Sequence, residues 1–306
     1  MLTKTQLYSD LLAKSKEQNA ENIQKHKLET ARILKGYSRR HAAKAILPKI
    51  PLDFFAIGDS WFEYPLYDNG PILEETAIVA DAQLGSMGNP PPHILNQALH
   101  GQATTAMLSW ENQELYISLL QDPNQWLNKD TGLPDAILVS GGGDDLVGDQ
   151  FAIYLDYEGG GLNLGRFQGA LDSVIASYMD LFAFRDIFAK RVPIIGHCYD
   201  YAIPNGVVPI CVQTAWLQPS LQFAGYDYNQ GLVIVSETID KFHDALAGLA
   251  TVPKNNFMLI DTRKTLKRDA TSPTGWANEI HPYFAGFTAL AEVFLKALKA
   301  RFPNRI

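Results

Sequence analysis

Cysteine is scarce in this chain of 306 residues, which has only Cys198 and Cys211. Two cysteines are too few for the disulfide framework of a small secreted protein, so we predict free thiols in a reducing compartment. The N-terminus lacks the apolar core of a signal peptide, and no apolar run is long enough to cross a bilayer. We therefore expect a cytoplasmic protein without a membrane span, with an exported protein as the alternative.

Positive charge is also in short supply, because 26 Lys and Arg face 33 Asp and Glu, which gives a formal net charge of −7. This balance excludes a general nucleic-acid-binding surface. The charge is uneven: residues 1–50 carry eleven basic and four acidic side chains, so this segment is +7 and the remainder −14. The basic segment could dock on the acidic body or on a second subunit of a homo-oligomer, or present a solvated helical face.

Glycine and proline are nearly absent from residues 3–47, where only Gly36 interrupts an Ala- and Lys-rich stretch. This composition predicts one or two helices. Pro48 and Pro51 end the stretch, so we divide the chain into an N-terminal basic helical arm, 1–50, and a main domain, 51–306.

At 46% hydrophobic residues, the chain can form a large core. Inserted loops are expected near 72–92, 150–165 and 199–226.

In the main domain, apolar runs alternate with helical patterns, which indicates a parallel sheet with right-handed crossovers. One segment, 77–80, fits either a strand or the end of a helix. Strands are predicted at 53–57, 93–99, 136–140, 192–196 and 257–260, and helices at about 104–120, 166–190, 229–249 and 284–301.

A hydroxyl follows the first predicted strand directly. The run Gly58-Asp59-Ser60 comes after Asp53–Ile57, and glycine suits a tight turn that needs unusual backbone angles. Because ligands of open α/β sheets bind at the carboxyl ends of the strands, Ser60 is a candidate nucleophile. The alternative is an ordinary turn, since Gly, Asp and Ser are common turn and cap residues.

Two further strand ends and the segment before the last helix supply polar groups or a glycine that can lie at the same edge. Gly101 follows the second strand, Asp144 and Asp145 follow the third, and His281 lies just before the last helix. Parallel strands end at one edge of a sheet, so these residues can converge on Ser60.

Taken together, four blocks resemble the SGNH or GDSL-type serine hydrolases across about residues 51–300. The resemblance implies a flavodoxin-like three-layer α/β/α sandwich, with a mostly parallel five-stranded sheet in the order 2-1-3-4-5. It also implies a serine esterase that hydrolyses carboxylic esters of lipid, carbohydrate or small-molecule type through an acyl-enzyme, with no cofactor. The blocks are Gly58-Asp59-Ser60, Asn96 to Thr104, Ser140 to Leu146, and Asn278-x-x-His281-Pro282.

The roles implied by this resemblance fall on few residues. Ser60 would attack the ester carbonyl, and His281 would take the serine proton and return it to the leaving alcohol. The backbone N–H groups of Ser60 and Gly101 would hold the oxyanion. Pro282 would begin the final helix.

Two positions depart from the family pattern. Asp144 stands where the family has the oxyanion-hole Asn; it could donate a hydrogen bond only if protonated, and otherwise it caps the following segment. Asn278 stands where the family has the triad acid. We expect a Ser-His dyad with Asn278 orienting the ring, and the carboxylates of Glu279, Asp261 and Asp200 are the alternatives.

Further residues near these blocks could form the substrate pocket. Trp61, Tyr64, Asp145 and His197 are candidates for substrate binding, with a structural or core role as the alternative. The acidic residues 144, 145 and 149 lack the glycine and terminal Glu of a calcium loop, so no metal is expected. A rival interpretation is a catalytically degenerate protein of the same fold that binds an ester or glycan without cleaving it.

Overall fold

The computed structural model describes residues 3–43, 47–67, 73–75, 78, 83–157, 159–209, 212–269 and 271–305. Cys211 and most of the ambiguous segment 77–80 lie outside these residues, as does part of the expected loop 72–92. Within the described residues, no helix is long and apolar enough to cross a membrane.

A five-stranded parallel sheet forms the centre of the main domain. Its strand order is β4-β1-β5-β8-β9, which is the predicted order 2-1-3-4-5, and helices flank it. The apolar runs become strands because both faces of the sheet are covered. The strands are β1 (Asp53–Gly58), β4 (His93–Asn96), β5 (Ala136–Ser140), β8 (Ile194–His197) and β9 (Phe257–Ile260).

The second strand is shorter than predicted. It ends at Asn96 rather than at residue 99, because the Asn96 side chain redirects the backbone: its Oδ1 accepts the N–H of Ala98 at 3.0 Å and its Nδ2 donates to the carbonyl of Phe62 at 2.9 Å.

Three long helices follow the predicted bounds closely. They are α5 (Leu164–Phe188), α7 (Tyr228–Ala250) and α8 (Phe284–Arg301). The helix predicted over 104–120 is instead two helices, α2 (Thr104–Met107) and α3 (Trp110–Leu120), because the Ser109 hydroxyl caps the second one. Pro282 does not begin α8: it lies two residues before it and forms a β-bridge with Trp276.

The predicted insertions are short ordered elements in the described residues. β2 (Pro65–Tyr67) pairs antiparallel with β3 (Leu73–Glu75), and β6 (Leu155–Asp156) pairs antiparallel with β7 (Gly161–Leu162). The region 199–226 contains the helix α6 (Gln218–Phe223), and the short helix α4 (Gly143–Leu146) follows β5.

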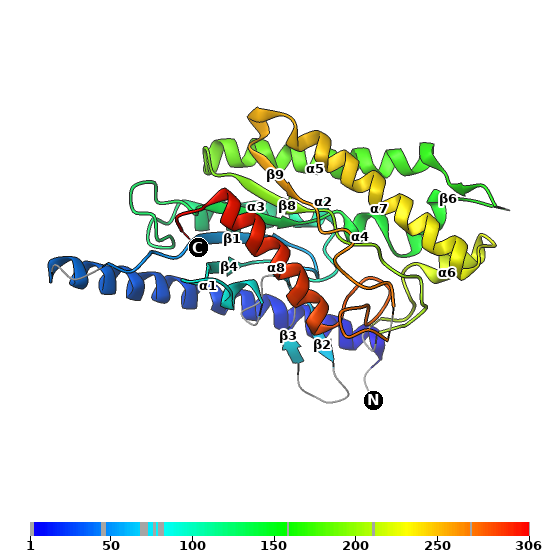
Figure 1. The fold of residues 1–306 in the computed structure, drawn as a ribbon, viewed down its shortest axis with the longest axis horizontal. Coiled ribbons are helices and arrows are strands. Elements are labelled where there is room, and N and C mark those ends of the chain that lie inside the picture. The colour runs from blue at the N-terminus through cyan, green and yellow to red at the C-terminus, as the bar shows by residue number, and fades with distance from the viewer. Residues whose placement is uncertain are drawn as a thin grey trace.

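The N-terminal arm is one helix of 39 residues, α1 (Lys4–Ala42), which runs along the molecule beside β4 (Figure 1). It contacts its own main domain through polar side chains. Asn19 Nδ2 donates to the Ala98 carbonyl at 3.0 Å, and Thr30 Oγ1 donates to the Gln125 carbonyl at 3.1 Å. Most of its basic residues are exposed, and one of them, Lys27, forms an ion pair with Asp122 at 2.7 Å. Homo-oligomerisation through the arm stays a prediction.

Candidate active site

Ser60 and His281, 221 positions apart in the sequence, meet at the carboxyl end of β1. Ser60 Oγ lies 2.7 Å from His281 Nε2. Gly58 makes the turn before Ser60 with a φ of +146°, and a Cβ atom there would stand 2.2 Å from the Ser140 carbonyl oxygen. Only glycine fits this approach of the two strand ends, so the sequence motif has a steric cause.

Asn278 orients the imidazole of His281. Its Oδ1 lies 3.1 Å from His281 Nδ1 and also accepts the backbone N–H groups of Ile280 and His281, while its Nδ2 donates to Tyr64 Oη at 3.0 Å. These partners identify Oδ1 as an acceptor and so place the ring proton on Nδ1. The lone pair of Nε2 then faces the Ser60 hydroxyl, as a general base requires.

Aromatic rings enclose the imidazole. Tyr64 stacks on His281 with ring centroids 3.8 Å apart and planes 11° from parallel, and Trp216 approaches the ring edge-on at 5.5 Å. Burial lowers the pKa of His281 to about 3, and the neighbouring His100 adds to the shift. The ring is therefore neutral near pH 7 and can accept a proton.

Two backbone N–H groups beside Ser60 Oγ are unpaired. Neither the N–H of Ser60 nor that of Gly101 has a partner among the hydrogen bonds of the described residues. Gly101 has a φ of +71°, and a Cβ atom there would stand 2.1 Å from Tyr8 Oη on α1. Two free donors next to a nucleophile can hold the oxyanion of a tetrahedral intermediate.

Asp144 lines the same pocket from α4. No side-chain hydrogen bond reaches its carboxyl group within the described part of the chain, and burial raises its pKa well above the usual range. The carboxyls of Asp59 and Asp145 add to this shift through like-charge repulsion. A protonated Asp144 would present an O–H donor beside the two backbone N–H groups.

A buried hydrogen-bond network fixes Asp59, the residue before the nucleophile. Ser140 Oγ donates to Asp59 at 2.6 Å, and the Tyr199 hydroxyl donates to its other oxygen. The same hydroxyl accepts the N–H of Gly143 at 2.9 Å, which ties this network to the first residue of α4. Sequence reasoning missed Tyr199, whose only signal was its position just after a predicted strand.

A second network holds the loop that carries Gly101. The carboxylate of Glu63 accepts both the backbone N–H and Nδ1 of His100 at 3.1 Å, and Ser15 Oγ on α1 donates to it at 2.7 Å. Thr5 and Tyr8 of the same helix line the pocket. The arm, predicted as a separate segment, is therefore part of the wall of the site.

Hydrogen bonds within the protein fix three of the four predicted substrate-binding residues, and of these three only Trp61 also lines a pocket at Ser60. The indole N–H of Trp61 donates to the Ile280 carbonyl at 2.9 Å, so this buried side chain ties the nucleophile turn to the histidine loop. Asp145 is fully engaged by the backbone N–H and hydroxyl of Thr104, both at 2.9 Å. His197 is completely buried, with its Nε2 2.9 Å from Ser140 Oγ. Only Tyr64 lines the larger pocket at Ser60.

None of the alternative carboxylates replaces Asn278. Glu279 accepts four backbone N–H groups, from Gly206 and from residues 216–218. Asp200 accepts the N–H groups of Tyr201, Lys264 and Leu266. Asp261 is paired with Arg263 at 2.8 Å. Each carboxylate is thus committed to a local structural role away from the imidazole.

Two cavities meet at Ser60. The larger, of about 430 Å³, contains Ser60, Gly101, Asp144 and His281, with residues of α1 on one wall. The smaller, of about 50 Å³, contains Ser60 and Asp144 but neither Gly101 nor His281. Trp61 contributes to this smaller cavity only.

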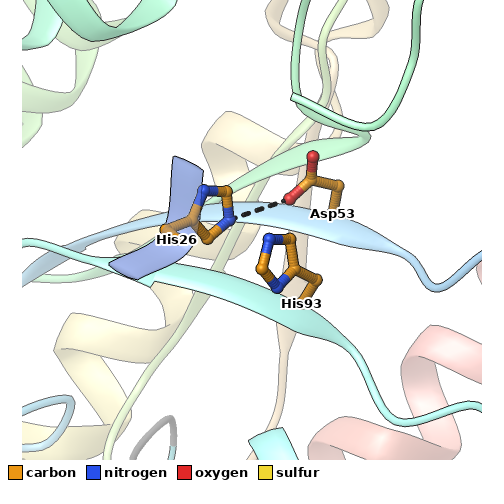
Figure 2. Close-up of side chains that lie close together, drawn as sticks. All are labelled: His26, Asp53 and His93. Carbon is orange, nitrogen blue, oxygen red and sulfur yellow. Dashed lines mark hydrogen bonds and ion pairs between the residues drawn. The ribbon is translucent and has the colours of Figure 1, made fainter. Parts of the chain in front are cut away.

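A separate cluster beneath α1 has the composition of a metal site. One ligand atom from each of His26, Asp53 and His93 lies within 4.8 Å of the others, and no further such group occurs among the described residues (Figure 2). The two imidazole rings, however, are stacked, with centroids 3.7 Å apart and planes 11° from parallel. Lone pairs of imidazole lie in the ring plane, so stacked rings cannot both point at one ion.

The same cluster is instead a docking point for α1. His26 Nε2 lies 3.1 Å from Asp53 Oδ1, and His93 Nε2 lies 3.0 Å from Thr30 Oγ1. Burial lowers the pKa of His26 to about 3 and that of His93 to about 4, and it raises the pKa of Asp53 to about 7. Both rings are therefore neutral near pH 7, as stacking in a dry interface requires.

Comparison with known proteins gives structural matches only. No family model matches the chain, and no curated protein matches it. The solved structures similar to it include an extracellular lipase from Streptomyces rimosus (15% identity, TM-score 0.49, covering 80% of this chain and 99% of that chain). A member of the lipolytic protein G-D-S-L family from Veillonella parvula is also similar (15% identity, TM-score 0.43, covering 81% of this chain and 98% of that chain). A third similar structure is Est24, a carbohydrate acetylesterase from Sinorhizobium meliloti (11% identity, TM-score 0.48, covering 81% of this chain and 99% of that chain).

Of these three, the Veillonella parvula protein belongs to the G-D-S-L family, which the four sequence blocks resemble. Because their identities with this chain are 11–15%, we base the functional assignment on the geometry of the site.

Proposed function

We propose that this protein is a serine ester hydrolase that works through a Ser60–His281 dyad and an acyl-enzyme. The observation that carries the proposal is the 2.7 Å contact between Ser60 Oγ and His281 Nε2, beside two unpaired backbone N–H groups. A nucleophile, a neutral base and free oxyanion donors at one point are the parts that acyl transfer needs.

The proposed reaction has two halves. In the first, His281 Nε2 takes the proton as Ser60 Oγ attacks the ester carbonyl, and the proton then passes to the leaving alcohol oxygen as the C–O bond breaks. In the second, His281 takes a proton from water, the hydroxide attacks the acyl-enzyme, and Ser60 leaves with its proton restored. The N–H groups of Ser60 and Gly101 accommodate the oxyanion in both halves.

The imidazolium formed in each half has no carboxylate partner. Asn278 Oδ1 accepts its Nδ1–H, and the face of Tyr64 lies against the ring at 3.8 Å. A cation over an aromatic face is stabilised by roughly 0.5–2 kcal/mol. Tyr64 thus supplies part of the charge stabilisation that a triad carboxylate would give.

We further propose that Asp144 is protonated in the active enzyme and donates to the oxyanion. Its raised pKa and its position in the pocket at Ser60 support this role. An ionised Asp144 would repel the oxyanion, so the proton on this carboxyl group is a condition for activity.

Labelling with a fluorophosphonate probe tests the proposal. We expect a covalent adduct on Ser60 by peptide mapping, and hydrolysis of p-nitrophenyl acetate that falls at least about 10³-fold in Ser60→Ala. His281→Ala should lower the rate comparably while leaving the fold intact by circular dichroism. A folded wild-type protein that is neither labelled nor hydrolytic would support the rival, an ester- or glycan-binding protein without catalysis.

A further inference from the structure

The two cavities at Ser60 differ in which catalytic groups they contain. Both contain Ser60 and Asp144, but only the larger contains His281 and Gly101. In the proposed reaction, His281 must give its proton to the oxygen of the leaving alcohol. The alcohol portion of the substrate must therefore lie in the cavity that His281 lines, which leaves the smaller cavity for the acyl portion.

The smaller cavity is small enough to select among acyl groups. Its volume is about 50 Å³, less than an eighth of that of the larger cavity, so of the two it has room for the smaller group only. Apolar side chains form most of its wall, and Leu146, Ile239, Phe242 and Trp276 line it without reaching the larger cavity. Such a pocket accepts a short aliphatic chain and excludes a long or aromatic one.

The larger cavity has room for a much bulkier group. At about 430 Å³ it is more than eight times larger, and its wall mixes aromatic with polar side chains. Tyr64 and Trp216 present rings, while Gln150 and Gln213 present amides. A sizeable alcohol with both apolar and hydrogen-bonding parts fits this wall.

On this basis, which rests on the proposed ester hydrolysis, we propose that the substrates are esters of short acyl groups, from acetyl to about butyryl, with bulky alcohols. A small, mainly apolar pocket restricts the acyl group, whereas the larger cavity leaves room for a bulky alcohol. The enzyme therefore selects by size on the acyl side of the ester bond only.

A pair of isomeric esters tests this directly. Benzyl acetate carries its ring on the alcohol, and methyl phenylacetate carries the same ring on the acyl group. With each rate divided by that of alkaline hydrolysis, we expect kcat/KM to be at least about 100-fold higher for benzyl acetate. A series of p-nitrophenyl esters holds the alcohol constant, and we expect the octanoate to react at least about 10-fold more slowly than the acetate or butyrate.

A cavity variant links the selectivity to this pocket. Ile239→Ala enlarges the smaller cavity from α7, and we expect the octanoate-to-acetate ratio of kcat/KM to rise at least about 5-fold. The matched control is Leu232→Ala, which removes the same number of carbons from a half-buried position on the same helix but lines neither cavity. Its ratio should equal that of the wild type.

The outcomes separate the two proposals. Hydrolysis of every ester tested with no preference between the isomers, and no change of the ratio in Ile239→Ala, would overturn the short-acyl assignment while leaving the esterase assignment in place. A protein that hydrolyses none of them and does not label at Ser60 would refute the ester hydrolase itself.

Discussion

Replacing Asp144 by Asn tests the proposed proton on that carboxyl group. Asn donates through its amide at every pH, whereas Asp donates only while protonated. One oxyanion donor contributes about 3–4 kcal/mol, or 10²–10³ in rate. Below the pKa of Asp144, the two side chains are equivalent as donors, so the variant should keep kcat/KM within about 10-fold of the wild type.

The sign of the pH effect follows from the direction of the shift. Burial and the neighbouring carboxyls raise the pKa of Asp144, so the wild type is protonated at low pH and loses its donor as pH rises through that pKa. We expect its kcat/KM to fall on the alkaline side and that of Asp144→Asn to remain level there. The assay is hydrolysis of p-nitrophenyl acetate from pH 5 to 10, corrected for the uncatalysed rate.

Two further variants make the result interpretable. Asp144→Ala removes the donor and should lose about 10²–10³ in kcat/KM at low pH. Asp145→Asn changes the adjacent carboxyl, which faces Thr104; it should keep an alkaline fall, moved to lower pH because one of the carboxyls that raise the pKa of Asp144 is gone. An Asp144→Asn variant that is inactive at every pH, or that retains the alkaline fall, would contradict the proposed proton on Asp144.

The remaining predictions concern His281 and the helix interface. Asn278→Asp places a carboxylate beside the imidazole and should raise the pKa of His281 from about 3, so the acidic limb of the kcat/KM profile should move to higher pH; an unmoved limb would contradict the assigned contact. Tyr64→Leu removes the stacked ring and should lower kcat about 2- to 30-fold, whereas Tyr64→Phe keeps the ring face and should lose less; equal losses would exclude the cation–π contribution. The pKa of His26 is about 3 in the folded protein and 6.5 ordinarily, so at a pH between these values the ring takes up a proton when the protein unfolds. The free energy of unfolding therefore decreases as the pH falls through this range. Measured by urea unfolding, the difference in the free energy of unfolding between the wild type and His26→Gln should therefore change by about 1.4 kcal/mol per pH unit from pH 4 to 6. A difference that stays constant over this range would show that the His26 ring is not neutral in the folded protein.

Local sequence patterns were sufficient to predict the sheet and the edge at which its strands end. Each of β1, β5 and β8 is an apolar run with a polar or glycine residue at its end, and parallel pairing brings such ends to one edge. That geometry placed Ser60, Gly101 and Asp144 at one edge, whereas the pairing of Ser60 with His281, which lies in the loop before α8, came from the family resemblance. The break at Ser109 was harder to predict, because the helical spacing of apolar residues hardly changes where a cap residue interrupts it.

Side-chain partners across the site could not be predicted from the sequence. Whether Trp61, Asp145 and His197 reach a substrate or a neighbour depends on rotamers and on loops distant in sequence. The contribution of α1 was also hidden. Its composition suggested a solvated basic helix, but the side chains that dock it, such as Ser15 and Asn19, are ordinary polar residues without a recognisable motif.

The two departures from the family pattern are best understood together. The family has an acid beside the histidine and an amide at the oxyanion hole, and this chain has the amide Asn278 beside His281 and the acid Asp144 at the hole. Without a negative charge next to it, a buried imidazole keeps a low pKa and rests as a free base. Burial and the carboxyls of Asp59 and Asp145 raise the pKa of Asp144 for the same reason: an additional charge in a dry site is unfavourable. With Asp144 protonated, as proposed, the resting site is neutral at both ends, and each charge that forms in the transition state meets a neutral dipole, the oxyanion at the Asp144 hydroxyl and the imidazolium at the Asn278 carbonyl. With that proton in place, the exchange of acid and amide leaves a donor at the oxyanion and an acceptor at the imidazolium, as the proposed ester hydrolase requires.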